Sequence, residues 1–216
     1  MKENCLRHGK CNIIGITGGV GAGKSTLLEY IKGSYNALVI YSDNVANDIK
    51  KKGLPAYDSI VALLGKEILG CDYEIDKKKM AQAIFGNEEL LDEVNKILHP
   101  AVNDYIINII ESERARFKYD FVFVEAALLI ENGYRDIVDE MWYVYADEEI
   151  RRDRLKRSRG YSDDRIREIF LSQLSDDEFR KSCDFVIDNS GEEGAAFEQI
   201  DNKLGEWKNN GEFGTA

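Results

Sequence analysis

Short apolar runs of strand length alternate along this chain with longer segments of helical periodicity. The runs around residues 38–40 and 121–124 hardly alternate between apolar and polar positions, which is typical of strands buried on both faces of a sheet. Strands that alternate with helices predict an α/β fold with a parallel sheet covered on both faces. The predicted strands are residues 12–16, 37–41, 121–124, 141–146 and 185–188.

Two long segments interrupt this alternation. Residues 45–117 show one helical pattern after another without a convincing strand, which predicts a helical insertion beside the sheet. One apolar helical face precedes Pro100 and another follows it. Residues 147–181 predict polar helices suited to a lid, with Ser175 and Glu178 spaced as a capping box. The expected divisions are an N-terminal arm at 1–11, one domain at 12–208 and a frayed tail at 209–216.

The composition is that of a globular protein, with 44% hydrophobic and 32% charged residues among 216. Lys and Arg number 29 against 40 Asp and Glu, and the net charge of −11 argues against binding to nucleic acid or to an anionic membrane surface. The longest apolar runs fall short of the roughly 18 residues that span a bilayer. Because the first residues lack the apolar stretch of a secretory signal, we expect a cytoplasmic protein with reduced cysteines.

Two cysteines and a histidine lie three residues apart near the start of the chain, at Cys5, His8 and Cys11. Thiolate and imidazole groups are the ligands that zinc prefers, but a structural zinc site needs four of them. A fourth ligand is not obvious, and Cys11 adjoins the first predicted strand. The pattern therefore favours an N-terminal arm over a zinc site.

A glycine-rich segment joins the first predicted strand to a helical pattern. It contains the GxxxxGK[ST] motif as Gly18, four further residues, Gly23, Lys24 and Ser25. In such a loop backbone N–H groups surround phosphate oxygens, the lysine reaches the β and γ phosphates, and the serine hydroxyl ligates Mg²⁺. The alternative is a glycine-rich turn without a nucleotide, which has no need of the lysine. The predicted nucleotide-binding residues are Gly19, Val20, Gly21, Ala22, Gly23, Lys24, Ser25 and Thr26, with Ser25 as the metal ligand.

Two acidic residues follow predicted strands at the sheet edge where ligands bind. Asp43 follows the second strand and Glu125 ends the third, and either carboxylate suits the orientation of a hydroxyl group or of magnesium. The alternatives are a helix N-cap for Asp43 and a carboxylate held by backbone donors for Glu125. Further along, six cations at residues 151–159 predict a lid that closes over phosphates, with a solvated helix face as the alternative.

Taken together, these segments resemble the dephospho-CoA kinase family from about residue 13 to residue 191. The resemblance implies a P-loop kinase-like parallel five-stranded sheet flanked by helices, with a helical CoA-binding region at about 45–117 and a lid at about 147–181. It also implies transfer of the γ-phosphoryl group of ATP, with Mg²⁺, to the ribose 3′-hydroxyl of dephospho-CoA, the last step of coenzyme A biosynthesis. The motifs that carry it are GITGGVGAGKST at 15–26, SDNVAND at 42–48, the stretch from Gly65 through Ile75 and Met80 to Phe85, LHPAV at 98–102, EAALLIENG at 125–133, RDRLKRSRG at 152–160, Gln173 and FVIDNSG at 185–191.

The resemblance assigns roles to residues at matching positions. Lys24, Asp43 and Arg154 would be catalytic, with Asp43 beside the acceptor hydroxyl, and Asn189 would lie near the adenine of ATP. His99 matches the family's His-Pro element, and the alternative from the residues alone, a helix cap or a packing residue, stays open beside that role. The implied substrate-binding residues are Thr17, Asp43, His99, Glu125 and Arg157.

The chain also departs from the family pattern after the third strand and in the lid. These departures leave two alternatives open: another small-molecule P-loop kinase of the nucleoside type, or a catalytically impaired nucleotide-binding paralogue. The departures are Glu125 and Ala127 in place of aspartate and proline, Ser158 (flanked by Arg157 and Arg159) in place of a second lid arginine, and Ile169 where arginine is common.

Overall fold

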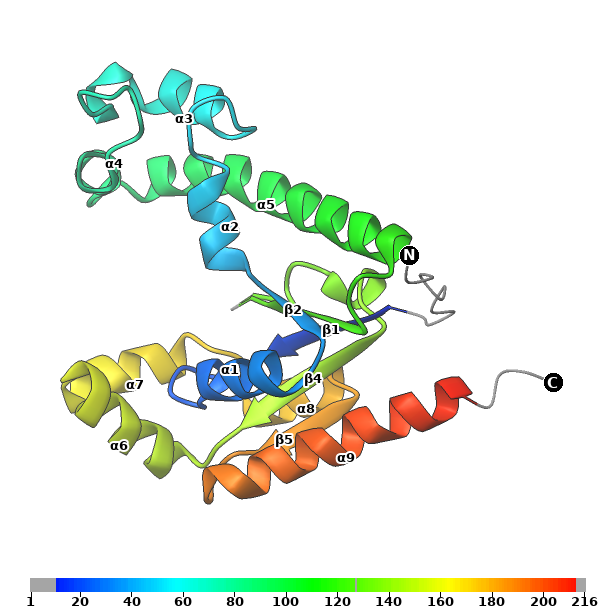
Figure 1. Ribbon diagram of the computed structural model, residues 1–216. Helices are drawn as coiled ribbons and strands as arrows, with labels where there is room; N and C mark the ends of the chain where they lie inside the picture. Colours follow the sequence, from blue (N-terminus) through cyan, green and yellow to red (C-terminus); the bar gives the residue numbers. More distant parts are fainter. Residues whose placement is uncertain (1–10, 127, 213–216) are drawn as a thin grey trace. The chain divides into compact units, whose positions relative to one another are not determined.

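A five-stranded parallel sheet is the central feature of the computed structural model, which describes residues 11–126 and 128–212, with side chains up to Trp207 (Figure 1). The order across the sheet is β2-β3-β1-β4-β5. The strands are β1 (Asn12–Thr17), β2 (Ala37–Tyr41), β3 (Phe121–Glu125), β4 (Glu140–Tyr145) and β5 (Phe185–Asp188). The predicted α/β fold is confirmed, and each predicted strand end lies within one residue of the observed one.

The central strand β1 pairs in parallel with β3 on one side and with β4 on the other, so that Ile16 is in register with Glu125 and with Trp142. Ile16 and Trp142 have no exposed surface. Burial on both faces explains why β3 lacks an alternating pattern. The same expectation is wrong for β2, because it lies at the edge of the sheet and Leu38 and Val39 are only half-buried. After β1 the chain passes β3 to form β2, the outer strand on that side. It then forms β3, and β4 lies on the opposite side of β1, so the strand order reverses at β1. The loop after β1 therefore lies where ligands of such sheets bind.

Helices separate the strands along the chain and cover the sheet. Tyr30 of α1 stacks on Phe197 of α9 with ring centroids 4.0 Å apart, and Phe179 of α8 stacks on Tyr143 of β4 at 4.7 Å. The helices are α1 (Lys24–Ser34), α2 (Ser42–Asp48), α3 (Tyr57–Leu64), η1 (Lys66–Ile68), α4 (Lys77–Ile84), α5 (Glu88–Arg116), η2 (Tyr134–Asp136), α6 (Glu148–Arg159), α7 (Asp163–Leu171), α8 (Asp176–Ser182) and α9 (Glu193–Glu212). The predicted capping box of Ser175 and Glu178 is present at the start of α8.

The chain divides into two compact units. The sheet unit comprises the residues up to Val39 and from Glu113 onward, and the helical unit comprises Ile40–Ser112. The helical unit contains α2, α3, η1, α4 and most of α5. It overlaps the helical insertion that was expected at residues 45–117.

The helical faces predicted before and after Pro100 belong to a single helix, α5, with Pro100 inside it. Proline lacks an N–H group and crowds the preceding turn, so it commonly ends or kinks a helix. Here the buried side chains of Val94, Val102, Ile106 and Ile110 are spaced by multiples of four residues. One continuous apolar face therefore extends along both halves of the helix.

The ends of the chain differ partly from expectation. Helix α9 continues to Glu212, so the frayed tail expected from residue 209 does not begin there. Residues 1–10, which include Cys5 and His8 and nearly all of the expected arm, lie outside the described residues, as do residues 213–216. Among the described residues, no helix has both the length and the apolar character that crossing a membrane requires.

Cys11, the last of the three residues considered for zinc, is buried directly before β1. Burial raises the pKa of its thiol above the ordinary value. Zinc binds the thiolate form, so a buried neutral thiol is a poor ligand. Within the described part of the chain, no group of three or more histidine, cysteine or acidic residues is arranged to hold a metal ion. These observations favour a packing role for Cys11.

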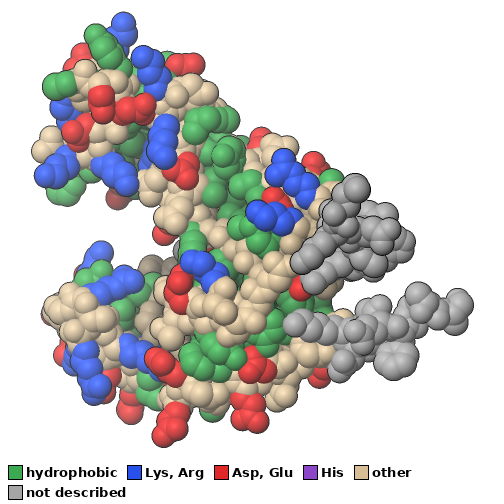
Figure 2. All heavy atoms as spheres, viewed as in Figure 1, with side chains coloured by type: hydrophobic (Ala, Val, Ile, Leu, Met, Phe, Trp, Pro, Cys, Tyr) green, Lys and Arg blue, Asp and Glu red, His purple; other side chains and the backbone are tan. Residues whose placement is uncertain are grey.

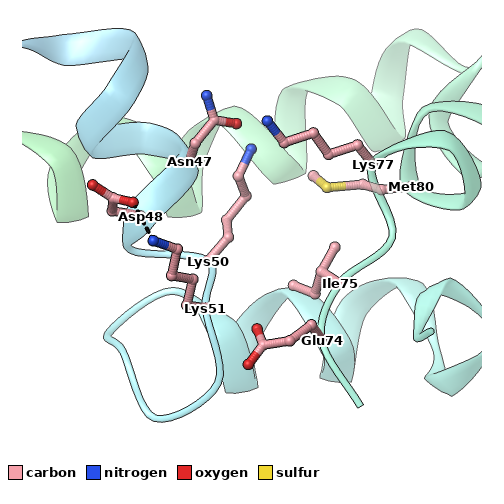
Figure 3. Close-up of a pocket in the computed structure, with 8 residues that line it drawn as sticks. All are labelled: Asn47, Asp48, Lys50, Lys51, Glu74, Ile75, Lys77 and Met80. Carbon is pink, nitrogen blue, oxygen red and sulfur yellow. Dashed lines mark hydrogen bonds and ion pairs between the residues drawn. The ribbon is translucent and has the colours of Figure 1, made fainter. Parts of the chain in front are cut away.

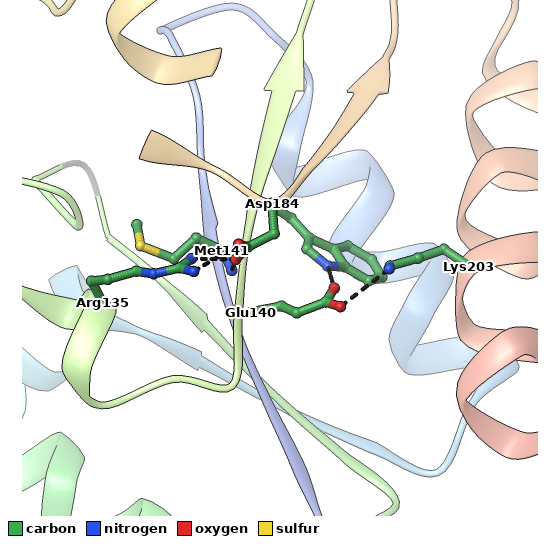
Figure 4. Close-up of polar contacts among 6 residues, drawn as sticks. Arg135, Glu140, Met141, Asp184 and Lys203 are labelled. Carbon is green, nitrogen blue, oxygen red and sulfur yellow. Dashed lines mark hydrogen bonds and ion pairs between the residues drawn. The ribbon is translucent and has the colours of Figure 1, made fainter. Parts of the chain in front are cut away.

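A polar network fastens the starts of β4 and β5, at the sheet edge opposite the carboxyl ends of the strands (Figure 4). The Arg135 guanidinium donates hydrogen bonds to both carboxylate oxygens of Asp184, one of them at 2.7 Å. Asp184 also accepts a hydrogen bond from the backbone N–H of Met141 at 2.8 Å. Lys203 of α9 donates to the Glu140 carboxylate at 3.1 Å. These bonds hold two strands and a helix together away from the ligand edge.

Candidate active site

The loop between β1 and α1 has the backbone that a phosphate-binding loop requires. Gly18, Gly21 and Gly23 have φ angles of 149°, 85° and 93°, a region that residues with a Cβ rarely adopt. The loop closes on itself through a hydrogen bond from Ala22 N–H to the Gly19 carbonyl at 3.1 Å. Helix α1 begins directly at Lys24. The positive end of its dipole therefore adjoins the loop, as anion binding favours.

Lys24 folds back over the loop that precedes it. Its Nζ donates a hydrogen bond of 2.6 Å to the Gly18 carbonyl and lies 3.8 Å from the Glu125 carboxylate. The side chains of Lys24 and Glu125 are only 14% and 19% exposed, so this pair is largely removed from water. This position favours the interpretation of Glu125 as a residue of the phosphate site. The structure thus brings together two predicted site residues, Glu125 at the end of β3 and Lys24 at the start of α1.

Asn189 and Arg154 pack against the far side of the loop. The Asn189 amide donates to the Ala22 carbonyl at 2.7 Å, and a Cβ at Gly23 would collide with that amide. The Arg154 guanidinium donates to the Asn189 carbonyl at 2.9 Å and to the Ala22 carbonyl at 3.3 Å. Asn189 is 2% exposed, and its Oδ1 has no hydrogen-bond partner among the described residues. Both residues therefore contact the phosphate loop, which places the predicted lid arginine Arg154 beside it.

Two further residues contact the loop although they were not among the predicted site residues. The Gln173 side chain accepts a hydrogen bond of 3.2 Å from the backbone N–H of Val20. The Arg151 guanidinium stacks over Phe170, 4.3 Å from the ring centroid, and lies so near Gly19 that a Cβ there would collide with it. The Nε of Arg151 is buried without a partner among the described residues. Arg151 precedes Arg154 by three residues on one helix, and this spacing was the available signal for it.

Arg157, which was expected to bind substrate, is not at the loop. Its side chain is 84% exposed and its guanidinium lies 3.9 Å from Asp153 of the same helix. Arg159 lies over the ring of Tyr161, 5.8 Å from the centroid. The arginines that reach the loop are therefore Arg151 and Arg154, which lie three residues apart on α6.

Two hydroxyl groups flank the loop. Thr17 ends β1, is 1% exposed, and its Oγ1 has no hydrogen-bond partner among the described residues. Ser25 and Thr26 are exposed in the first turn of α1. An exposed serine hydroxyl beside a phosphate site fits Mg²⁺, which usually takes one or two protein ligands and completes its shell with phosphate oxygens and water.

In the helical unit, Asp43 occupies the first turn of α2 and is exposed. The N-cap is Tyr41, so the alternative of Asp43 as a cap is wrong, and Ser42 makes no capping bond either. No hydrogen bond or ion pair of the Asp43 carboxylate is found among the described residues. The Asn47 side chain donates to the Asp43 backbone carbonyl at 2.8 Å. The Asp43 carboxylate is therefore exposed to solvent, on a helical turn that the Asn47 side chain stabilises.

His99 is exposed within α5, which continues beyond it to Arg116. It therefore neither caps a helix nor packs in a core, and both local alternatives are wrong. Of the positions at which the chain departs from the family pattern, Ala127 lies outside the described residues. Ser158 donates its hydroxyl to the Arg154 carbonyl at 2.7 Å, which turns its side chain back onto its own helix.

Comparison with known proteins gives relatives along nearly the whole chain. Residues 12–194 match the family model described as dephospho-CoA kinase. A dephospho-CoA kinase of Carboxydothermus hydrogenoformans is 37% identical over 196 residues, which cover 91% of this chain and 94% of the relative. One of Oceanobacillus iheyensis is 34% identical over 203 residues, which cover 90% and 97%.

Solved structures share the fold. TT1252 from Thermus thermophilus superposes with a TM-score of 0.72 at 26% identity, covering 91% of this chain and 97% of that one. A dephospho-CoA kinase from Campylobacter jejuni gives a TM-score of 0.69 at 22% identity, covering 92% and 98%, a similarity that shows the fold alone. The family model covers most of the chain, and identity to curated members reaches 37%. The chain therefore belongs to the dephospho-CoA kinase family.

Proposed function

We propose that this protein is a dephospho-CoA kinase, which transfers the γ-phosphoryl group of ATP to the ribose 3′-hydroxyl of dephospho-CoA. The reaction is the last step of coenzyme A biosynthesis. The observation that carries the proposal is the loop at residues 18–23, preorganised by its glycines and covered by Lys24, in a chain of this family. A loop of this kind identifies a phosphorylated nucleotide, and the family identifies the acceptor.

Phosphoryl transfer depends mainly on positioning and on stabilisation of charge. In this protein the loop N–H groups and Lys24 would hold the β and γ phosphates, and Ser25 would hold Mg²⁺. When bound, the ion neutralises charge that develops on the phosphate oxygens. Arg151 and Arg154 extend from α6 to the same loop, so their guanidinium groups would stabilise negative charge on the transferring phosphoryl group. Asn189 supports the loop through the hydrogen bond from its amide to the Ala22 carbonyl.

The acceptor residues carry the second half of the proposal. Asp43 orients the 3′-hydroxyl or accepts its proton, a role for which an exposed carboxylate without competing partners is suited. His99 on α5 would bind dephospho-CoA within the helical region at about 45–117. Thr17 and Glu125 lie beside Lys24 at the carboxyl ends of β1 and β3, and would position the phosphates and the metal. The lid would comprise residues 147–181, which form α6, α7 and α8.

The setting of the reaction follows from the same observations. We infer a cytoplasmic enzyme, since its substrates are intracellular metabolites. Polymeric nucleic acid is not expected as a partner, because the net charge of −11 opposes it. ATP and dephospho-CoA are also anionic, but they would bind at local sites whose lysines and arginines outweigh the average charge of the surface.

The direct test is a kinase assay with purified protein, Mg-ATP and a panel of acceptors. ADP release should be much faster with dephospho-CoA than with nucleosides or gluconate, and mass spectrometry of the product should show a 3′-phosphate. Omission of Mg²⁺ should abolish turnover. Activity on a nucleoside without activity on dephospho-CoA would replace the proposal with the nucleoside-kinase alternative. Tight ATP binding without transfer to any acceptor would indicate the impaired paralogue.

A further inference from the structure

The helical unit contains a cavity of about 590 Å³ (Figure 3). This volume is in the range of sites that take small organic ligands. The cavity lies between α2 with the turn that follows it and the start of α4 with the residues that precede it. Its lining residues are Asn47, Asp48, Lys50, Lys51, Glu74, Ile75, Lys77 and Met80.

The two carboxylates of the cavity are already engaged. Asp48 pairs with Lys51 at 2.6 Å, and the Glu74 carboxylate accepts a hydrogen bond from the backbone N–H of Lys52 at 3.0 Å. Lys50 and Lys77 have no ion pair with a carboxylate in the described part of the chain. Figure 3 shows their ammonium groups directed toward each other across the cavity, with the Asn47 amide beside them. The cavity therefore presents two unneutralised cations to its interior.

This arrangement is electrostatically unfavourable without an anion. Lys50 is half-buried, and burial together with the nearby Lys77 lowers the pKa of its ammonium below the ordinary value. Lys77 is exposed, but its charge still repels the half-buried ammonium of Lys50, whereas a bound anion would attract both groups. Figure 2 shows further Lys and Arg side chains over the lobe formed by α3 and α4, although the whole molecule is acidic. A cation pair of this kind is what a phosphate or diphosphate group requires.

The rest of the cavity is apolar and is linked to the proposed acceptor residue. Met80 is 7% exposed and Ile75 is half-buried, so both offer apolar surface beside the lysines. Asn47 belongs to the cavity and also donates to the Asp43 carbonyl one helical turn earlier. Four residues of α-helix span about 6 Å along its axis, so Asp43 lies about one turn from the cavity residue Asn47.

We propose that this cavity binds the 5′-diphosphate of dephospho-CoA through Lys50 and Lys77, with the adjoining pantetheine arm against Ile75 and Met80. The inference rests on the proposed function. The 5′-diphosphate and the reacting 3′-hydroxyl belong to the same ribose, which suits a site one helical turn from Asp43. The diphosphate carries two negative charges near neutral pH and so matches two ammonium groups. Lys50 and Lys77 are thus specificity-determining residues that select acceptors with a diphosphate over free nucleosides.

The test compares Lys50→Ala and Lys77→Ala with Lys96→Ala, a control that removes a lysine of the same unit whose ammonium pairs with Glu93 outside the cavity. Steady-state rates are measured with dephospho-CoA and with adenosine, which lacks the diphosphate, at saturating Mg-ATP. Each cavity variant should raise the KM for dephospho-CoA about tenfold or more, the range of one lost charge-assisted hydrogen bond. The KM for ATP and the slow rate with adenosine should stay within twofold of the parent protein.

Titration calorimetry with dephospho-CoA in the absence of ATP should show the same loss of affinity, and circular dichroism should show that the variants fold. Lys77→Arg should retain most of the affinity, because it keeps the charge. An unchanged KM for dephospho-CoA in both cavity variants, with the parent protein active, would overturn the cavity assignment and leave the kinase assignment intact. A parent protein that does not phosphorylate dephospho-CoA would overturn the function itself.

Discussion

The Lys24 ammonium is held over the loop by a hydrogen bond to the Gly18 carbonyl and by the nearby Glu125 carboxylate. Such preorganisation lowers the cost of reaching the geometry in which the ammonium binds phosphate oxygens. The same contacts keep the ammonium from extending into solvent. The Glu125 carboxylate stands where many family members have aspartate, and its longer side chain still approaches Lys24. This departure from the family therefore preserves the charge arrangement beside the loop.

Two single substitutions test the proposed catalytic groups. Lys24→Ala removes the principal phosphate cation, and Asp43→Asn removes the group that orients or deprotonates the acceptor. Each should lower kcat by about a hundredfold or more, the usual range for a major electrostatic or base contribution. Steady-state ADP release with Mg-ATP and dephospho-CoA measures the effect. Near-normal turnover of a purified Asp43→Asn variant would remove Asp43 from the mechanism.

Arg151 and Arg157 can be distinguished in the same assay. Because Arg151 reaches Gly19 while Arg157 is exposed, Arg151→Ala should reduce kcat by about ten- to a hundredfold, and Arg157→Ala should reduce it much less. Arg165→Ala is the matched control, since that arginine pairs with Glu168 at the surface of α7. Arg151→Lys should recover only part of the activity, because lysine cannot donate bidentately. Equal losses for the Arg151 and Arg157 variants would contradict the assignment.

At the scale of elements, α6 has two functions on two faces. The face with Arg151 and Arg154 reaches the phosphate loop, while Arg152 on another side pairs with Glu148 at 2.9 Å and with Asp163 of α7 at 3.3 Å. The run of cations therefore divides into residues that contact the loop and a residue that joins α6 to α7.

The starts of β4 and β5 provide a prediction on stability. Arg135 holds the pKa of the Asp184 carboxyl below its ordinary value, through a hydrogen bond and its charge. A lowered folded-state pKa stabilises the fold above the unfolded aspartate pKa of about 3.9, and this contribution is lost as the pH falls through the folded value. Asp184→Asn should therefore lower the free energy of unfolding at pH 7 by about 2 kcal/mol.

Urea denaturation followed by circular dichroism measures this difference. The difference in the free energy of unfolding between parent and variant should be constant from about pH 6 to 7 and should decrease below about pH 4. Asp153→Asn is the control, because Asp153 forms only a long, exposed ion pair with Arg157. A gap that persists unchanged to pH 3 would show that packing, rather than the charge of Asp184, connects these strands.

At the scale of the whole molecule, the two proposed substrates depend on different units of the chain. The phosphate loop belongs to the sheet unit, whereas Asp43 and the lysine cavity belong to the helical unit. The average charge of −11 conceals this organisation, since the cations that matter are concentrated in α6 and around the cavity. Substitutions in one unit should therefore affect one substrate.

Thermal shift measurements test this separation. A ligand at about 100 times its Kd stabilises the folded state by about 2.7 kcal/mol, so Mg-ATP should raise the Tm of the parent protein. The same increase is expected for Asp43→Asn and for Lys50→Ala, whereas Lys24→Ala should lose it. Dephospho-CoA should show the opposite pattern, with the loss in Lys50→Ala. Loss of the ATP shift in Lys50→Ala would indicate that the two sites are not independent.

Much of the architecture could be predicted from sequence because local signals agreed with one another. Apolar runs located the five strands to within one residue, and the spacing of Ser175 and Glu178 located a helix start. The phosphate loop was evident from its glycines and Lys24. The local alternatives for His99 were wrong because they assumed that a helix ends next to Pro100. The helix instead continues through the proline, since its apolar face is buried on both sides of that residue.

By itself the sequence determined the parallel α/β fold, the phosphate loop and the family, since each depends on the order of residues along the chain. Only the tertiary structure decided which arginines reach the loop, that Glu125 approaches Lys24, and that Lys50 and Lys77 face each other across one cavity. Most of these contacts join residues far apart in the sequence. The others join neighbouring elements, and a local sequence pattern does not predict how such elements pack. Burial and charge at such contacts follow from how the elements pack, which composition and spacing do not reveal.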